Sequence, residues 1–232
     1  MNAPLTLYEL AGADPTVRFS PHCWKTRMAL AHKGLDPVGI PWRFSEKEAI
    51  AFSGQGLVPV LVDGTETVSD SWRIAEYLEA RYADRPSLFG GAAGHSLSRF
   101  VNAFADSLVP LIARTILLDI YARIHPDDRD YFRASREKRF GMPLEQAASD
   151  PDQSRTTLRA ALAPLRLTLQ AQPFLAGESP AYADYAVFGM FMWGRGASPV
   201  DLLAEDDPLT PWRERLLDAF DGLARRAPAA AD

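Results

Sequence analysis

The chain contains a single cysteine, Cys23, among its 232 residues. One cysteine excludes an internal disulfide framework and is typical of a protein kept in a reducing compartment. It also excludes a dithiol redox centre within the chain, because such a centre needs two thiols.

The sequence also lacks a long hydrophobic run and a basic leader. A membrane-spanning helix needs about 20 consecutive apolar residues, whereas the stretch "SLVPLIARTILL" is interrupted by Pro110 and Arg114. The first residues, "MNAPLTLYEL", have neither a basic region nor a long apolar core. We therefore expect a soluble, cytoplasmic protein that does not associate with membranes.

The chain has fewer basic than acidic residues: 25 lysines and arginines against 30 aspartates and glutamates, which gives a net charge of -5. This balance gives no electrostatic reason to expect binding to nucleic acid or to anionic membranes. The apolar content of 47% and the charged content of 24% are ordinary for a globular protein. The length suits one large domain or two small ones.

The first 80 or so residues alternate between strand and helix patterns. Pro21 in a first turn and Gly34 just past the end are the usual start and stop signals of a helix. Asp63-Gly64 between two β-prone runs predicts a hairpin turn. The predicted elements are a strand at 5–10, a helix at 21–33, a strand at 37–42, a weak helix or loop at 44–52, a hairpin of 60–62 and 67–69, and a helix at 71–82.

After the linker "DRPSLFGGAAG" every pattern is helical. We expect long helices over 95–124, over 152–170 with a kink at Pro164, and over 208–226. The segment 181–194 is apolar on nearly all sides, which marks a central buried helix. The sequence therefore predicts an α/β domain of residues 1–86 followed by an all-α domain of residues 87–232.

The stretch "FSPHCWKTRMALAHKG", residues 19–34, begins like half of a dithiol site. Two cysteines spaced three apart at the start of a helix make a redox site of the thioredoxin type, and here Ser20 takes the first position. A hydroxyl at a helix N-terminus lies among unpaired N–H groups and the positive end of the dipole, a place that favours an anion. No neighbouring side chain is placed to deprotonate it, so Ser20 would donate to a thiolate that a ligand brings in.

Simpler interpretations of these residues stay open. Ser20 can serve only as the helix cap, with Pro21 at the first helical position. Cys23 can be a small buried apolar residue or a redox thiol. Trp24 is expected to pack in the core, and His22 is expected at the surface.

Two further segments point to a peptide-like thiol. A cis bond between Val58 and Pro59 would expose the Val58 N–H and C=O for pairing with an extended peptide, whereas a trans proline would only open the strand. Ser71 at a helix start can hold a carboxylate, and Asp70 can hold an ammonium. The free amino-acid end of a peptide would satisfy both residues.

These features resemble the cytosolic glutathione transferases along almost the whole chain. The resemblance implies a thioredoxin-like N-terminal domain, an all-helical C-terminal domain, a homodimer, and glutathione as cosubstrate with no metal. It also implies that the aspartate of "YADYAVFG", Asp184, is structural. It assigns Ser20 as catalytic serine, Val58 and Pro59 to the cysteinyl part of glutathione, and Asp70 and Ser71 to the γ-glutamyl end.

Within that superfamily the chain is most similar to the bacterial β-etherases and related fungal etherase-type transferases, in segments such as "SPHCWKTRMALAHKG" and "DSWRIAEYLE". Two positions depart from the family pattern. Leu57 stands where glutamine is frequent, which removes a polar contact to the peptide. Ala181 stands where a serine or threonine caps the helix, and such a loss typically costs about 1 kcal/mol.

The resemblance leaves two parts of the site open. The glycyl carboxylate of glutathione needs a cation or an indole N–H, and the candidates are Trp42, Arg43 and Lys47. An apolar cosubstrate would lie between the domains, on the helix over 95–124. The residues that we expect to line this second part are Phe104, Leu108, Ile112 and Thr115.

The resemblance implies an enzyme, a detoxifying glutathione transferase in which Ser20 stabilises the glutathione thiolate for attack on an apolar electrophile. An aryl-ether carbon is the electrophile that the etherase resemblance favours. Two alternatives stay open: a binding protein that carries glutathione or apolar ligands without turnover, and thiol-disulfide exchange through Cys23.

Overall fold

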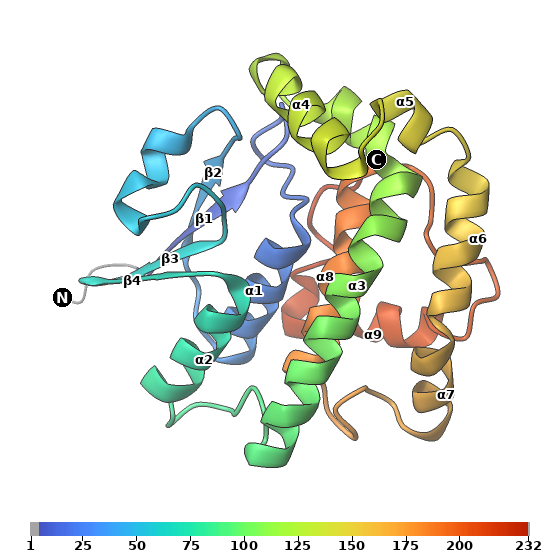
Figure 1. The fold of residues 1–232 in the computed structure, drawn as a ribbon. Coiled ribbons are helices and arrows are strands. Elements are labelled where there is room, and N and C mark those ends of the chain that lie inside the picture. Colours follow the sequence, from blue (N-terminus) through green and yellow to red (C-terminus); the bar gives the residue numbers. More distant parts are fainter. Residues whose placement is uncertain (1–4, 232) are drawn as a thin grey trace.

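The computed structural model describes residues 5–231 and contains one mixed sheet packed against a set of helices (Figure 1). The strands follow the order β2-β1-β3-β4, with β1 parallel to β2 and antiparallel to β3, and β3 antiparallel to β4. Their bounds are β1 Thr6–Leu10, β2 Val38–Trp42, β3 Val60–Asp63 and β4 Glu66–Ser69. The sheet and its order are those of the thioredoxin-like domain that the resemblance implies.

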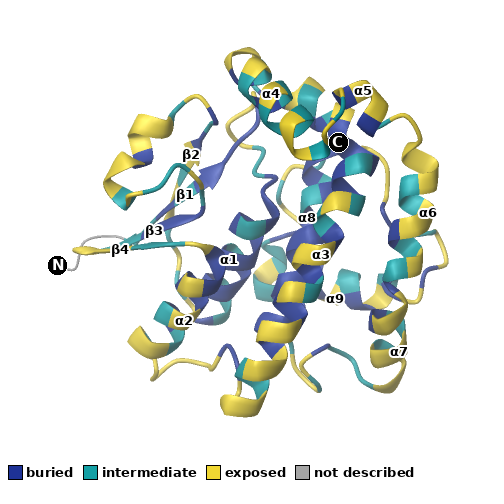
Figure 2. Cartoon of the chain, in the orientation of Figure 1, coloured by how far each residue is buried: buried dark blue, intermediate teal, exposed yellow. Residues whose placement is uncertain are grey.

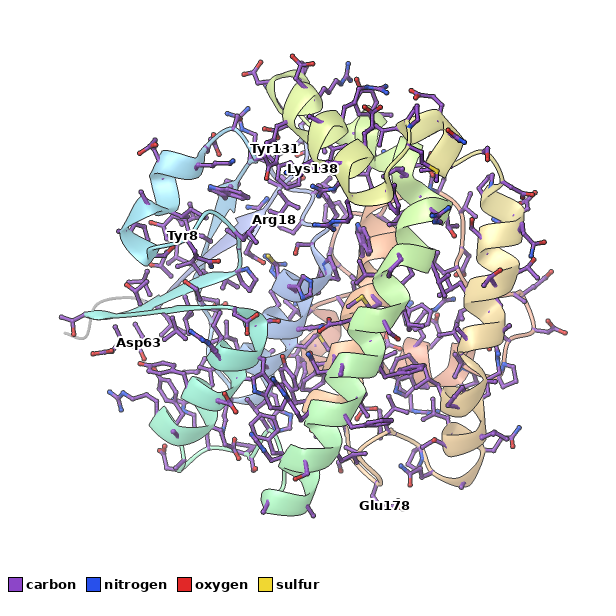
Figure 3. The ribbon with its side chains drawn as sticks, in the orientation of Figure 1. Tyr8, Arg18, Asp63, Tyr131, Lys138 and Glu178 are labelled. Carbon is purple, nitrogen blue, oxygen red and sulfur yellow. The ribbon has the colours of Figure 1, made fainter. Side chains whose placement is uncertain are left out.

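The hairpin of β3 and β4 forms where the sequence predicts it. Gly64 has a φ of 62°, a left-handed conformation that glycine adopts without steric cost, and Asp63 pairs with Glu66 across the turn. Helix α2, Ser71–Arg81, follows directly. Tyr77 in this helix and Tyr82 just after it donate their hydroxyls to Asp63 Oδ2 at 2.8 and 2.7 Å, which ties the hairpin end to the helix. Asp63 is labelled near the hairpin in Figure 3.

Helix α1, Pro21–His32, lies between the sheet and the helical half of the molecule (Figure 1). Trp24 and Met28 are fully buried, as the spacing of the apolar residues predicts, and Ala31 at the end of the same stripe is half-buried. Figure 2 shows α1 and the core of the helical half as the most deeply buried helical surfaces, with exposed residues on the outer faces of α6 and α7.

The helical half confirms the all-α prediction, and the boundary expected between residues 86 and 87 falls in the segment that joins α2 to α3. Within residues 5–231, no helix is both long and apolar enough to cross a bilayer. The bounds are α3 Ala92–Arg123, α4 Arg129–Phe140, α5 Leu144–Ala147, α6 Pro151–Ala161, α7 Ala163–Ala171, α8 Tyr182–Ala197 and α9 Thr210–Gly222, with short 3-10 turns η1 Lys47–Ser53 and η2 Pro126–Asp128.

The predicted helix over 152–170 is wrong in one respect, because it is two helices. The chain leaves α6 at Leu162 and starts α7 one residue later, so that Pro164 occupies the first turn of a new helix, where its missing N–H costs nothing. The closing helix is also interrupted. Ala219 is extended, and Phe220 and Asp221 are left-handed, so the regular part of α9 ends before the predicted limit at 226.

Among the polar contacts that join the two halves are those of three buried or half-buried side chains, Lys25, His32 and Tyr182. Lys25 of α1 is fully buried, and its ammonium donates to Asp106 Oδ1 of α3 at 2.8 Å and to Asn102 Oδ1 at 2.9 Å. Nδ1 of His32 lies 2.7 Å from the hydroxyl of Tyr185 on α8. The contact of Tyr182 runs from its hydroxyl to the carbonyl oxygen of Ser71.

Candidate functional site

Ser20 is the N-cap of α1. Its extended backbone (φ -66°, ψ 127°) precedes Pro21, and its Oγ accepts the Cys23 N–H at 3.3 Å. A hydroxyl that accepts a backbone hydrogen bond still has its own proton to donate. The side chain is 5% exposed and lines a cavity, so it can meet a ligand there. Capping and ligand binding are therefore compatible roles for this one hydroxyl.

Cys23 is fully buried one turn into α1. Burial raises the pKa of its thiol to about 12, with a further rise from Glu9, and the neighbouring Ser20 hydroxyl lowers it only in part. The thiolate is the reactive form of cysteine. At neutral pH this side chain is a protonated, enclosed thiol, which supports its interpretation as a packing residue.

The expectation that His22 lies at the surface is wrong. The imidazole is half-buried and lines the same cavity as Ser20, because the first turn of α1 faces the helical half of the molecule. Burial lowers the pKa of His22 to about 4, and the nearby Lys25 ammonium lowers it further. The ring is therefore neutral at physiological pH.

The peptide bond between Val58 and Pro59 is cis. Val58 is half-buried and Pro59 is buried at the entry to β3. Leu57 and Val58 line the cavity beside the first turn of α1, so the backbone of this segment and Ser20 border one space. Leu57 itself is 58% exposed, which leaves an apolar side chain at the rim where a glutamine is frequent in the family.

Asp70 and Ser71 begin α2 but do not line that cavity. Asp70 has a φ of 78°, and its Oδ1 accepts the N–H groups of Trp72 and Arg73 at 3.0 and 3.1 Å. Ser71 is buried. The Asp70 carboxylate is close enough to α1 to favour the protonated form of His22, so the two predicted parts of the site are neighbours.

The three candidates for the glycyl carboxylate differ in what they already bind. The indole N–H of Trp42 donates to the Glu46 carbonyl at 2.7 Å, so it is not available to a ligand. Arg43 holds the Glu46 carboxylate through Nε at 3.0 Å and Nη2 at 2.7 Å. Lys47 is exposed, and its ammonium lies 4.2 Å from the ring centroid of Tyr131 on α4. Figure 3 labels Tyr131 beside the N-terminal half.

The cavity has a volume of about 470 Å3 and lies between the N-terminal half and helices α3, α4 and α8. This size is within the range of small-molecule sites. Most of its walls are apolar and aromatic. The aromatic side chains are Phe19, Trp42, Phe44, Phe132, Phe140 and Trp193.

The cosubstrate residues predicted on α3 are not among those that line the cavity, and this prediction needs correction. Leu108, Ile112 and Thr115 are buried on α3, and Phe104 is half-buried. The cavity meets a neighbouring face of the helix, because the strongest apolar stripe of α3 is used to pack the core. The α3 residues that line it are Val109, Pro110, Ala113, Arg114, Leu117 and Ile120.

Asp184 has the structural position that the resemblance implies. Its carboxylate is fully buried and accepts the Ala181 N–H at 3.1 Å, the Leu175 N–H at 2.7 Å and the indole N–H of Trp212 at 2.8 Å. Ala181 offers no side-chain cap at the start of α8. The aspartate instead joins the loop before α8, the helix itself and α9 through one side chain.

Comparisons with known proteins agree with the fold. A model of the glutathione S-transferase N-terminal domain matches residues 19–81, and a model of the C-terminal domain matches residues 97–210. A zeta-class glutathione S-transferase of Euphorbia esula is 30% identical over 112 residues, which cover 46% of this chain and 50% of the plant protein. The chain spans about half the length of the curated relatives it matches.

Solved structures extend the likeness to nearly the whole chain. A glutathione transferase of Phanerochaete chrysosporium is 25% identical, with a TM-score of 0.82 over 93% of this chain and 97% of that one. A glutathione S-transferase of Ceriporiopsis subvermispora, solved in complex with glutathione, is also 25% identical, with a TM-score of 0.79 over 94% of this chain and 97% of that one. With both domain models matched in order and the fold shared throughout, the chain belongs to the cytosolic glutathione transferase superfamily.

Proposed function

We propose that the protein is a glutathione transferase, in which residues 1–86 bind glutathione and residues 87–232 contribute the site of an apolar electrophile. The observation that carries this proposal is the single cavity that Ser20, Val58 and α3 border together. A thiol held by the Val58 backbone would have the Ser20 hydroxyl on one side and apolar walls on the other.

Glutathione supplies the sulfur nucleophile, and the chain supplies the place that stabilises its ionised form. The Ser20 hydroxyl donates to the thiolate, and the N-terminus of α1 adds the positive end of its dipole. A hydrogen bond to a charged group contributes about 1.5–3 kcal/mol. Since one pKa unit corresponds to about 1.4 kcal/mol, this donor alone can lower the thiol pKa by one to two units.

The remaining contacts that we propose rest on the family resemblance and on which side chains are still available. Val58 pairs its backbone with the cysteinyl part, and Asp70 and Ser71 receive the γ-glutamyl end. We propose Lys47 for the glycyl carboxylate, because Trp42 and Arg43 are already engaged with Glu46. The buried, protonated thiol of Cys23 argues against the alternative of thiol-disulfide exchange through this residue.

An aryl ether is the electrophile that we propose first, with the sulfur attacking the ether carbon and a phenolate leaving. The aromatic lining of the cavity suits such a substrate. A panel of aryl ethers and halogenated aromatics, followed by product identification, tests this choice. We further propose a cytoplasmic homodimer, which light scattering of the purified protein tests.

The role of Ser20 is tested by the variants Ser20→Ala and Ser20→Thr. We expect Ser20→Ala to lower kcat/KM about tenfold to a hundredfold, since the lost hydrogen bond is worth about 1.5–3 kcal/mol, with little change in glutathione affinity. Ser20→Thr keeps both cap and hydroxyl and should retain most of the activity. Ultraviolet absorbance of bound thiolate reports the ionisation directly.

Two outcomes would contradict the proposal. Full activity in Ser20→Ala would remove the hydroxyl from the mechanism. Calorimetric binding of glutathione without its consumption by any electrophile of the panel would favour the ligand-binding alternative. Thermal unfolding of each variant separates these results from the loss of a helix cap.

A further inference from the structure

The cavity beside Ser20 contains cations but no carboxylate. Arg114 of α3 and Arg136 and Arg139 of α4 line it, and no aspartate or glutamate of residues 5–231 is among its lining residues. This contrasts with the chain as a whole, in which acidic residues outnumber basic ones. Three positive charges therefore border the space where a small molecule would bind.

Arg136 is the most enclosed of the three. Its guanidinium carbon lies 4.5 Å from the ring centroid of Phe132 and 5.2 Å from that of Phe44. Burial lowers the pKa of Arg136 to about 10, and the neighbouring Arg139 contributes to the decrease, so the group keeps its charge at neutral pH. A cation in such surroundings is partly dehydrated, which favours an anionic partner.

The hydrogen bonds that Arg136 makes do not balance its charge. Its Nη1 donates to Ser135 Oγ at 2.9 Å, and within the described part of the chain no carboxylate lies at ion-pair distance from it. Arginine has five N–H donors, and cation–π contact with Phe132 uses none of them. Most of its donors therefore stay available to a ligand.

Several other half-buried arginines have a carboxylate partner, whereas Arg159 and Arg195 donate to backbone carbonyl oxygens instead. Arg27 pairs with the buried Glu9, and Arg166 holds Asp207 through two nitrogens. Arg139 and Arg136 are one turn apart on α4, a spacing at which like charges repel and destabilise the helix. An anion between them would remove both the repulsion and the uncompensated charge.

We propose that the electrophile of this transferase carries a carboxylate, so that its aromatic body lies against the walls of the cavity and its anionic group binds Arg136, with Arg139 and Arg114 beside it. The guanidinium fork matches the two oxygens of a carboxylate. This inference rests on the proposed function, since it names the class of cosubstrate for the same site.

Glutathione itself offers a second source of the same anion, its glycyl carboxylate. The two sources predict different effects of losing Arg136. If Arg136 binds the cosubstrate, glutathione affinity stays the same and only acidic electrophiles suffer. If Arg136 binds glutathione, its affinity falls and every electrophile is affected equally.

The experiment compares a chloronitrobenzoate with the corresponding chloronitrobenzamide, which has the same shape without the charge. Each kcat/KM is divided by the uncatalysed rate with glutathione, which corrects for intrinsic reactivity. We expect the wild-type protein to prefer the benzoate about tenfold, since a charge-assisted hydrogen bond is worth at least one decade. Arg136→Met retains the apolar stem over the two rings and should abolish this preference.

Two control variants distinguish a specific contact between Arg136 and the carboxylate from a general electrostatic effect of the positive charges on α4. Arg136→Lys keeps the charge and should keep part of the preference. Lys138→Met removes the same charge from an exposed position of α4 outside the cavity lining and should leave the preference intact. Loss of the preference in Lys138→Met, or weaker glutathione binding in Arg136→Met with equal effects on both substrates, would overturn the proposal.

Binding of unreactive ligands keeps this test independent of catalysis. Naphthoate and naphthamide are titrated calorimetrically without glutathione, and we expect naphthoate to bind about tenfold more tightly to the wild-type protein but not to Arg136→Met. Equal affinities would contradict the carboxylate site even if conjugation occurs. Tight naphthoate binding with no conjugation of any substrate would instead contradict the proposed function alone.

Discussion

Replacing Gly189 by alanine should destabilise the protein and disturb the start of α1. Gly189 lies in the buried middle of α8, and a Cβ built there would be 2.5 Å from the carbonyl oxygen of Pro21 and 3.1 Å from Cγ of Lys25. Ordinary contacts begin at 3.4 Å. The obstacle is backbone, so α1 or α8 must shift by about 0.9 Å to accept one methyl group.

The expected magnitude is the difference of two effects. Inserting a methyl group into a packed core costs about 1–3 kcal/mol, while alanine is favoured over glycine inside a helix by about 1 kcal/mol. We therefore expect Gly189→Ala to lower the free energy of unfolding by up to about 2 kcal/mol, which corresponds to a decrease of several degrees in melting temperature at this chain length. Because Pro21 follows Ser20, kcat should fall as well.

Gly194→Ala is the matched control on the same helix. A Cβ at Gly194 would meet only side-chain atoms of Leu202, at 2.7 and 2.9 Å, and a side chain can change its rotamer. The gain in helix propensity is the same, so this variant should be less destabilised than Gly189→Ala. Differential scanning calorimetry and initial rates test both. A Gly189→Ala protein as stable and active as the wild type would refute the reasoning.

Two other predictions concern buried ionisable groups. Burial holds the pKa of His22 at about 4 in the folded protein, below the ordinary value of 6.5. Between these two pH values the unfolded chain binds more protons than the folded protein, so His22 makes the free energy of unfolding rise with pH across this window. In His22→Asn the urea midpoint of unfolding should rise less steeply with pH. An unchanged rise would contradict the lowered pKa of His22. The second prediction concerns Lys25, whose buried ammonium keeps only Asn102 as partner in Asp106→Ala. This variant should therefore lose more stability than Lys25→Met. The opposite order of the two losses would argue against the ion pair.

Local signals in the sequence predict the start of α1 and the turn between β3 and β4 well. Ser20 and Pro21 determine where α1 begins through their own hydrogen bonding and fixed φ, and Asp63-Gly64 determines the hairpin turn. These residues act within one or two turns of the chain, so no knowledge of the tertiary structure is needed. Their prediction is confirmed for that reason.

The cavity lining could not be predicted in the same way. The periodic pattern on α3 selects its most apolar stripe, which includes Leu108 and Ile112, and that stripe packs the core. The face toward the cavity contains Pro110 and Arg114, which look like breaks in an apolar pattern. Likewise, Arg136 is one of several charges on α4 in the sequence, and only the fold reveals that it lacks a carboxylate partner.

The dependence of α1 on the helical half limits how this molecule can be divided or recombined. Ser20 belongs to the first 86 residues, yet the helix that it caps is held by Asp106 and Tyr185 and lies directly against Gly189. A chimera that exchanges the C-terminal half must therefore preserve an acid, a hydroxyl and a glycine at these three places, or the grafted half will not hold in place the helix that Ser20 caps.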